Sequence, residues 1–252
     1  MTESPPPHLQ MLLDGTDWAS LATPCGTGES LPAALTRLLD PDPAVRAAAA
    51  KDALGQVTHQ NSIYEATVPV ARYVAAVLGH PAITVGDFGL ATDEPPHSPT
   101  LVKLLAWLGD TAYDADDEVV AIGERHDEDF LDEYREMREF RDQRPMFFSA
   151  VGPLLDHDNT EVRDTALVAA IPLSEHPALT VHRTELVRHA RRLLATSTDR
   201  RHRDRALDAM RAWGHDTSGL ENSPDIEARE RYARLRAARA SWTSGYSEEP
   251  PF

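Results

Sequence analysis

The sequence predicts an all-α protein built from a repeated helix–turn–helix unit. Three observations support this prediction. Apolar residues recur at helical spacing in most segments, turns rich in Asp and Pro separate those segments, and one turn sequence occurs more than once. The apolar residues are mainly Ala, Leu and Val, and aromatic residues make up only 6% of the 252 residues. This composition suits closely packed helices and is poor material for a large β-sandwich.

The two ends of the chain differ from the segment between them. Residues 1–15 are rich in Pro, and we expect them to be poorly ordered. Residues 241–252 contain Ser, Gly, Glu and Pro, and we expect a flexible tail there. The segment 16–240 is predicted to form one domain. We expect a cytoplasmic protein, because the first residues lack a secretory signal pattern and no apolar run is long enough to span a bilayer.

The first predicted helix pair spans residues 30–57. Ser30, followed by Leu31 and Pro32, is typical of a helix start. The sequence Asp-Pro-Asp-Pro over residues 40–43 ends that helix, and a second helix is expected from Ala44.

The middle of the chain carries two further helices. The pair Ser62 and Glu65 forms a capping-box pattern, and we expect a buried helix from there to Leu78 because its residues are apolar nearly all round. Residues 80–99 contain Gly and Pro and are predicted to form a long loop. Residues 101–108 predict another buried helix that ends at Gly109.

An acidic insert covers residues 110–144. It contains 14 acidic residues and five arginines, which together contribute −9 to the net charge of −16. Apolar residues at helical spacing predict one helix near residues 127–143 with an acidic outer face. The acids between residues 114 and 118 lie close together without cations nearby in the sequence, which favours a role in binding a partner. The other interpretation is a solvated helix laced with Glu/Arg pairs, each of which contributes little. The candidate partner-binding residues are Asp114, Asp116, Asp117, Glu118, Glu124, Asp127, Glu128, Asp129, Asp132 and Glu133.

One turn sequence recurs along the chain. Residues 38–46, Leu-Leu-Asp-Pro-Asp-Pro-Ala-Val-Arg, match residues 154–163, Leu-Leu-Asp-His-Asp-Asn-Thr-Glu-Val-Arg, with one residue inserted. A weaker third copy has Leu193-Leu194, a polar turn, and then Arg203 to Ala206. Repetition of such a unit is typical of a stacked solenoid.

This repeated sequence resembles HEAT repeats, and the resemblance implies an α-solenoid of stacked antiparallel helix pairs. In that family the Asp helps to close the turn, the Val packs inward from the second helix, and the Arg bridges neighbouring repeats near the turn. The corresponding residues here are Asp40, Val45, Arg46, Asp156, Val162 and Arg163. The resemblance says more about the fold than about the function.

No complete catalytic motif is found in the sequence. The segment from Cys25 to Gly28 lacks the Gly-Lys-Ser/Thr ending of a phosphate-binding loop. The pair His126-Asp127 resembles the metal-binding pair of HD phosphohydrolases, but the further ligands of those enzymes are not evident. A single cysteine excludes an internal disulfide and a Cys-based zinc site. We therefore expect no catalytic residue, cofactor or metal.

The leading functional hypothesis is a non-catalytic module that holds a basic protein through its concave face and acidic insert, in one version an immunity-type protein that neutralises a toxin. The alternatives are a nucleic-acid-acting enzyme similar to HEAT-like DNA glycosylases, and a general scaffold or regulator. The net charge of −16 opposes nucleic-acid binding, although residues 183–239 hold 14 arginines against nine acids. We expect a monomer that binds neither nucleic acid nor membrane. Arginine supplies nearly all the positive charge, as in proteins of GC-rich bacteria.

Overall fold

The computed structural model describes residues 5–84 and 99–243, with side chains up to residue 238. Helices dominate, and the only sheet in these ranges pairs β1 (Ala22–Thr23) with β2 (Gly26–Thr27). The predicted all-α class is confirmed. The chain divides into two compact units, Met1–His189 and Ala190–Phe252, where one domain had been expected.

The first helix, α1 (Pro7–Asp14), lies within the segment that was expected to be poorly ordered. Leu9 is fully buried and Leu13 is nearly so, and the indole of Trp18 donates to the Leu13 carbonyl at 2.8 Å. Pro7 stands at the first helical position, where no backbone N–H is needed. The prediction is therefore wrong for residues 7–14, because the prolines that discourage a helix interior suit a helix start.

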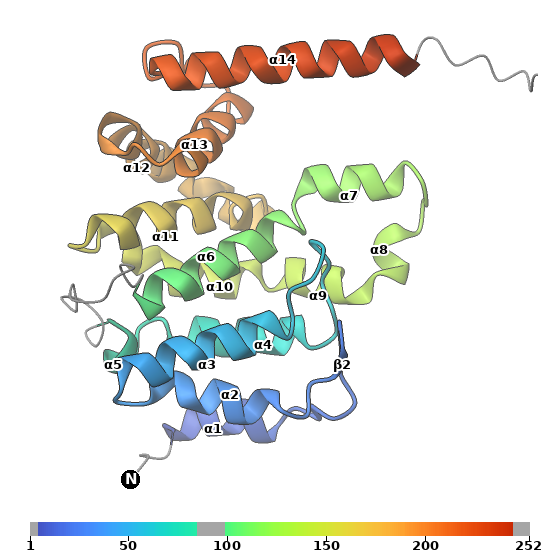
Figure 1. Cartoon of the computed structure of the whole chain (residues 1–252), viewed down its shortest axis with the longest axis vertical. Helices are drawn as coiled ribbons and strands as arrows, with labels where there is room; N and C mark the ends of the chain where they lie inside the picture. Colours follow the sequence, from blue (N-terminus) through green and yellow to red (C-terminus); the bar gives the residue numbers. More distant parts are fainter. Residues whose placement is uncertain (1–4, 85–98, 244–252) are drawn as a thin grey trace, which may run out of the picture. The chain divides into compact units, whose positions relative to one another are not determined.

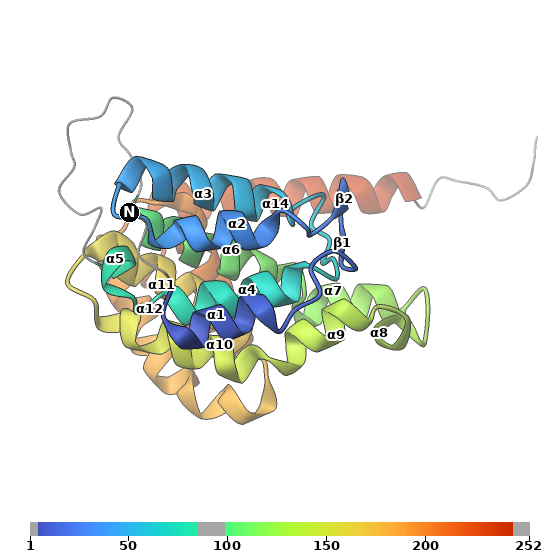
Figure 2. The same ribbon diagram turned by 90° about the horizontal axis from the view of Figure 1, so that it is seen from below.

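The helix pair predicted over residues 30–57 is present as α2 (Leu31–Thr36), the 3-10 helix η1 (Arg37–Leu39) and α3 (Pro43–Gly55). Figures 1 and 2 show α2 and α3 side by side.

The buried helix expected from the capping box is α4 (Thr67–Val77), which begins later than predicted. The carboxylate of Glu65 accepts the N–H of Ala22 at 2.8 Å and so holds β1, instead of reaching back to Ser62. The predicted capping box is therefore not formed. The later start places Pro69 in the first turn, where a proline is tolerated.

The centre of unit 1 is the packing of α6 (Thr100–Tyr113) against α11 (Thr160–Leu173), which lie side by side in Figure 1. Helix α6 runs through Gly109, where its end had been predicted. A Cβ atom at Gly109 would lie 3.0 Å from Cα of Ala169, so the glycine serves close helix packing and not helix termination. Helix α5 (Pro81–Thr84) precedes this pair, and most of the predicted loop 80–99 falls outside the described residues.

The acidic insert holds several short helices in place of the single one predicted near 127–143. They are α7 (Asp117–Glu124), α8 (Phe130–Glu133) and α9 (Arg135–Asp142), followed by α10 (Arg144–Val151). The break between α8 and α9 lies at Tyr134, whose φ and ψ are −96° and 69°. Its hydroxyl accepts the N–H of Ile63 at 2.7 Å and donates to the Ile63 carbonyl at 2.8 Å. These tertiary hydrogen bonds hold Tyr134 outside the helical conformation.

The repeated turn shares one arginine hydrogen bond in all three copies, the second between η2 (Gly152–Asp156) and α11 and the third before α13 (Arg200–Ala212). An arginine guanidinium reaches back to the carbonyl six residues earlier: Arg46 to Asp40 at 2.7 Å, Arg163 to His157 at 2.7 Å, and Arg203 to Ser197 at 3.1 Å. Arg46 and Arg163 also donate to the carbonyl five residues earlier, whereas Arg203 donates to the carbonyls of Leu194 and Leu220. Each arginine therefore closes its own turn.

The side chains of the turn are equivalent as well. The first residue accepts the N–H two residues on, through Asp40, His157 or Ser197. The residue two positions later then caps the next helix, and these caps are Asp42, Asn159 and Asp199.

This equivalence aligns the copies without a gap. The residue that corresponds to Asp40 is His157, so the predicted insertion and the turn-closing role of Asp156 are wrong. The third copy is aligned through Arg203, which corresponds to Arg46 and Arg163. Val162 is fully buried as predicted, whereas Val45 is only half-buried.

The second unit contains the end of α12 (Arg183–Thr196), which follows η3 (Pro177–His182), together with α13 and α14 (Ser223–Thr243). Asp225 pairs with Arg203 at 2.6 Å, and both side chains are almost fully buried. At the start of α14 the backbone N–H of Asn222 donates to the Asp225 carboxylate, and the backbone N–H of Asp225 donates to the Asn222 side-chain oxygen. Residues 241–243, expected in a tail, belong to α14, and the rest of that segment is outside the described residues. No helix in the described ranges has the length and apolar character to cross a membrane.

The turn-closing arginine predicts a stability effect. Replacing Arg46 by Met leaves two carbonyls without their donor, and we expect it to lower the free energy of unfolding by about 2–4 kcal/mol. The matched control is Arg37→Met, because Arg37 is exposed and makes only a 3.9 Å ion pair with Asp52. The control should change stability by less than about 0.5 kcal/mol. Urea unfolding of the two variants measures the difference, and equal losses would contradict the assigned role.

Candidate functional site

The candidate binding surface is the segment from Asp117 to Glu133, which we name the acidic corner. It comprises α7, α8 and their connection, and both Figure 1 and Figure 2 place it at one edge of unit 1. Its exposed carboxylates are Asp117, Glu118, Glu124, Glu128, Asp129, Asp132 and Glu133. The structure therefore brings most of the predicted binding residues onto one short, projecting segment.

Some acids in and beside the acidic corner support the local structure. Asp116 caps α7 by accepting the N–H of Val119 at 2.8 Å, and Asp127 accepts the N–H of Asp129 at 3.0 Å. Asp132 pairs with Arg138. Asp114 is half-buried at the end of α6. These residues explain part of the acidic composition without any partner.

Other carboxylates of the acidic corner have no such role. Within the described part of the chain, no ion pair or side-chain hydrogen bond involves five of its exposed acids. They are Glu118, Glu124, Glu128, Asp129 and Glu133. Ile122 of α7 lies among them and is 43% exposed, which is high for a large apolar side chain. The acidic corner thus combines uncompensated negative charge with an exposed apolar side chain.

A network centred on the buried Arg144, named the anchor cluster, fixes the acidic corner to the rest of unit 1. Arg141 and Arg144 both donate to the carbonyl of Ala115, the latter at 2.6 Å. Arg141 also pairs with Asp117 at 2.6 Å, and Glu175 accepts the Asp117 N–H at 2.9 Å. The prediction that the acids near residues 114–118 lack cations is wrong for Asp117, because two arginines more than 20 residues later fold back onto it.

The charges of the anchor cluster are costly to bury. Burial, reinforced by the nearby charge of Asp117, raises the pKa of Glu175 to about 7. Burial also lowers the pKa of Arg144 to about 10, and the nearby positive charge of Arg141 lowers it as well. Glu175 and Arg144 lie 3.3 Å apart, yet desolvation outweighs their mutual attraction. Perturbed pKa values often mark catalytic sites, but here each group already holds a backbone partner. The arrangement is that of a structural network.

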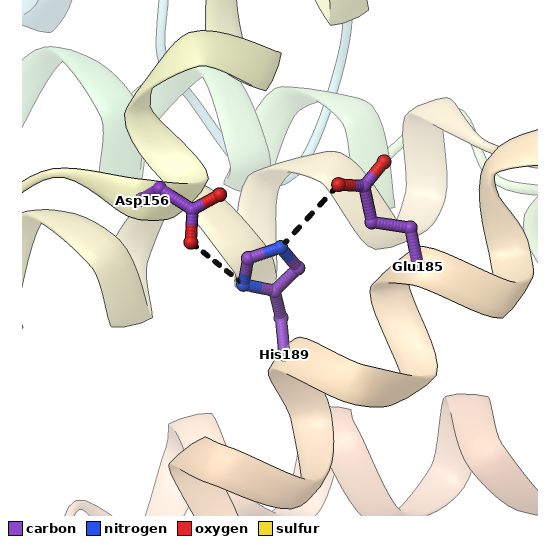
Figure 3. Close-up of side chains that lie close together, drawn as sticks. All are labelled: Asp156, Glu185 and His189. Atoms are coloured by element: carbon purple, nitrogen blue, oxygen red, sulfur yellow. Dashed lines mark ion pairs between the residues drawn. The ribbon is translucent and has the colours of Figure 1, made fainter.

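A separate group of side chains has the atoms of a metal site. Asp156, Glu185 and His189 offer ligand atoms within 4.8 Å of one another, and no other group of three His, Cys, Asp or Glu in the described ranges does so (Figure 3). Sequence reasoning assigned Asp156 to a turn and missed this group, although Glu185 and His189 are four residues apart on one helix. The pair His126-Asp127 belongs to no such group there.

Comparisons with known proteins give no match: no family model, no curated protein and no solved structure is similar to this chain. The function of this chain is therefore inferred from its own geometry alone.

The raised pKa of Glu175 predicts a dependence of stability on pH. Between pH 4.5 and about 7 the folded protein holds a proton on Glu175 that the unfolded chain has lost, so the free energy of unfolding falls as pH rises through this range. Glu175→Gln keeps an acceptor for the Asp117 N–H but cannot ionise.

We expect the stability of Glu175→Gln relative to the native protein to rise by about 1–3 kcal/mol between pH 5 and pH 8, at about 1.4 kcal/mol per pKa unit. Chemical unfolding at a series of pH values checks this. Parallel stability curves for the two proteins would show that Glu175 does not titrate in this window.

Proposed function

We propose that this chain is a non-catalytic binding module that holds a basic protein against its acidic corner. One observation carries the proposal. Five exposed carboxylates gather on a segment of 17 residues whose one arginine is Arg125, and none of the five forms an ion pair within the described chain. The neighbouring acids that the fold uses cap a helix or pair with an arginine. The functional surface is thus distinguishable from the structural charges around it.

Electrostatics support a cationic partner. Like charges on a short segment repel one another, and a basic surface that approaches them would relieve the repulsion and gain attraction. Such complementarity raises association rates and selects partners more than it raises affinity. The exposed Ile122 supplies the apolar contact that a charged rim needs at its centre.

The anchor cluster supports the same proposal. A binding segment held by Arg141, Arg144 and Glu175 loses little freedom on association, which lowers the entropic cost of binding. The recurrence of the arginine-closed turn in three places supports a HEAT-like solenoid as the scaffold behind this segment.

A second candidate, nucleic-acid binding, has one observation in its favour. A groove of about 1040 Å³ between α13 and α14 is lined by six arginines, including Arg201 and Arg236. Three aspartates line the same groove, among them Asp204, which pairs with Arg200. Because these carboxylates offset the positive charge and would repel phosphates, the groove is a weaker basis for a function than the acidic corner.

The test compares two triple charge reversals. The corner variant carries Glu124→Lys, Glu128→Lys and Glu133→Lys, which leaves the cap Asp116 and the anchor residue Asp117 intact. The control variant carries Glu29→Lys, Asp52→Lys and Glu227→Lys, exposed sites outside the acidic corner with the same change of charge.

Each protein is used to capture partners from a lysate of the organism that makes it, and the captured partner is then purified for binding measurements. We expect a basic protein that the native chain and the control variant hold at low salt and release at high salt. The corner variant should bind it at least tenfold more weakly, which is roughly 1.4 kcal/mol. Equal loss in both variants, or capture of nucleic acid alone, would contradict the proposal.

A further inference from the structure

We propose that Asp156, Glu185 and His189 form a binding site for a divalent transition-metal ion such as Zn²⁺, and that Arg188 closes this site when the ion is absent. The site is separate from the acidic corner, and the proposal does not depend on the proposed function. The geometry of four side chains supports it, namely those of Asp156, Glu185, Arg188 and His189.

The three ligands come from two elements of unit 1. Asp156 ends η2, and Glu185 and His189 lie one turn apart on the same face of α12. Figure 3 shows the imidazole between the two carboxylates: Nδ1 lies 3.9 Å from Asp156 Oδ1, and Nε2 lies 3.9 Å from Glu185 Oε1. His189 is only 2% exposed, whereas both carboxylates are more than half exposed. Burial therefore fixes the histidine, whereas the exposed carboxylate of Glu185 can adjust its position.

The hydrogen bonding of His189 leaves the correct nitrogen ready for a metal. Nη2 of Arg188 lies 2.8 Å from Nε2 of His189. Since a guanidinium has only donors, Nε2 must accept, so its lone pair points at Nη2 and the ring proton sits on Nδ1. A metal ion needs this same lone pair.

The position of Arg188 marks where the ion would sit. Its Nη2 is 3.4 Å from Glu185 Oε1 and 3.8 Å from Asp156 Oδ2, in addition to the contact with His189. One positively charged nitrogen thus lies among all three ligand atoms. The Arg188 side chain is 58% exposed, so it can move into solvent without leaving a buried gap. The arginine occupies the site as an internal cation that a metal ion can replace.

The distances and atom types suit a transition metal. Two ligands at about 2.05 Å from a tetrahedral zinc ion lie about 3.3 Å apart, so the observed 3.9 Å between Nε2 and Oε1 requires only a small movement of an exposed carboxylate. One imidazole with two carboxylates favours Zn²⁺, Co²⁺ or Ni²⁺ over Ca²⁺ or Mg²⁺, which prefer all-oxygen sites. With three protein ligands, the fourth position is left to water.

The test is the binding of Zn²⁺ to tag-free full-length protein, measured by calorimetry and by the shift in the thermal unfolding midpoint. We expect one ion per chain. Arg188→Met should tighten binding by about tenfold, because the ion no longer competes with an arginine that occupies the site most of the time. Loss of a ligand in His189→Gln, or in the exposed ligand variant Asp156→Asn if the buried change unfolds the chain, should weaken binding by about 10- to 100-fold.

The control is His126→Gln, which removes an exposed histidine on the acidic corner and should leave zinc binding unchanged. Two results would overturn the proposal. One is the absence of zinc binding by the folded native protein and by Arg188→Met. The other is binding that survives the ligand substitutions or disappears in His126→Gln, which would place the ion on the acidic corner.

Discussion

The interaction on which this structure depends is the burial of an arginine at the start of a helix, where its guanidinium closes the preceding turn. Arg46 and Arg203 are almost fully buried, and Arg163 makes the same pair of bonds to backbone carbonyls. Burying a guanidinium is costly unless its donors are satisfied. Here the turn must therefore present its carbonyls inward, and an Asp or Asn must cap the next helix so that its N–H groups are satisfied too. This requirement fixes the reversal of the chain before α3, α11 and α13.

The same residue type organises the acidic insert, but with carboxylates added to the carbonyl. Arg141 and Arg144 converge on the Ala115 carbonyl and bring Asp117 and Glu175 with them. The result is an anchor in which Glu175 and Arg144 each have a partner, although the Nε atom of Arg144 is buried without a hydrogen bond. Desolvation of these two groups shifts their pKa values. The fold also uses acids beyond Asp117, because Asp127 accepts a backbone N–H and Asp132 pairs with Arg138. A functional explanation has to account for the five exposed acids that take part in no such interaction.

The sequence predicted the helical class and the repeated turn because both are local: helical periodicity, a proline stop and a capping Asp act within a few residues. It could not predict the break at Tyr134, because the hydroxyl that holds it binds Ile63, 71 residues away. It also misjudged Asp117, since the pairing arginine lies 24 residues later, and it misaligned Asp156, since only the hydrogen bonds reveal that His157 takes the place of Asp40. The first two errors come from long-range contacts, which periodicity does not encode, whereas the third lies within one turn, where a histidine and an aspartate accept the same hydrogen bond.

The negative charge of the carboxylates in this chain is balanced in two ways, and this difference relates the two candidate sites to each other. Where an arginine can reach them, as Arg188 reaches Asp156 and Glu185, the chain supplies its own cation, and an external ion must compete with it. Where no described arginine reaches them, as at Glu124 and Glu128, the compensating charge has to come from outside. A small ion suits the first arrangement because His189 adds a directed lone pair beside two carboxylates. A broad basic surface suits the second because its carboxylates lie exposed along a projecting segment, where one ion could neutralise only a few of them.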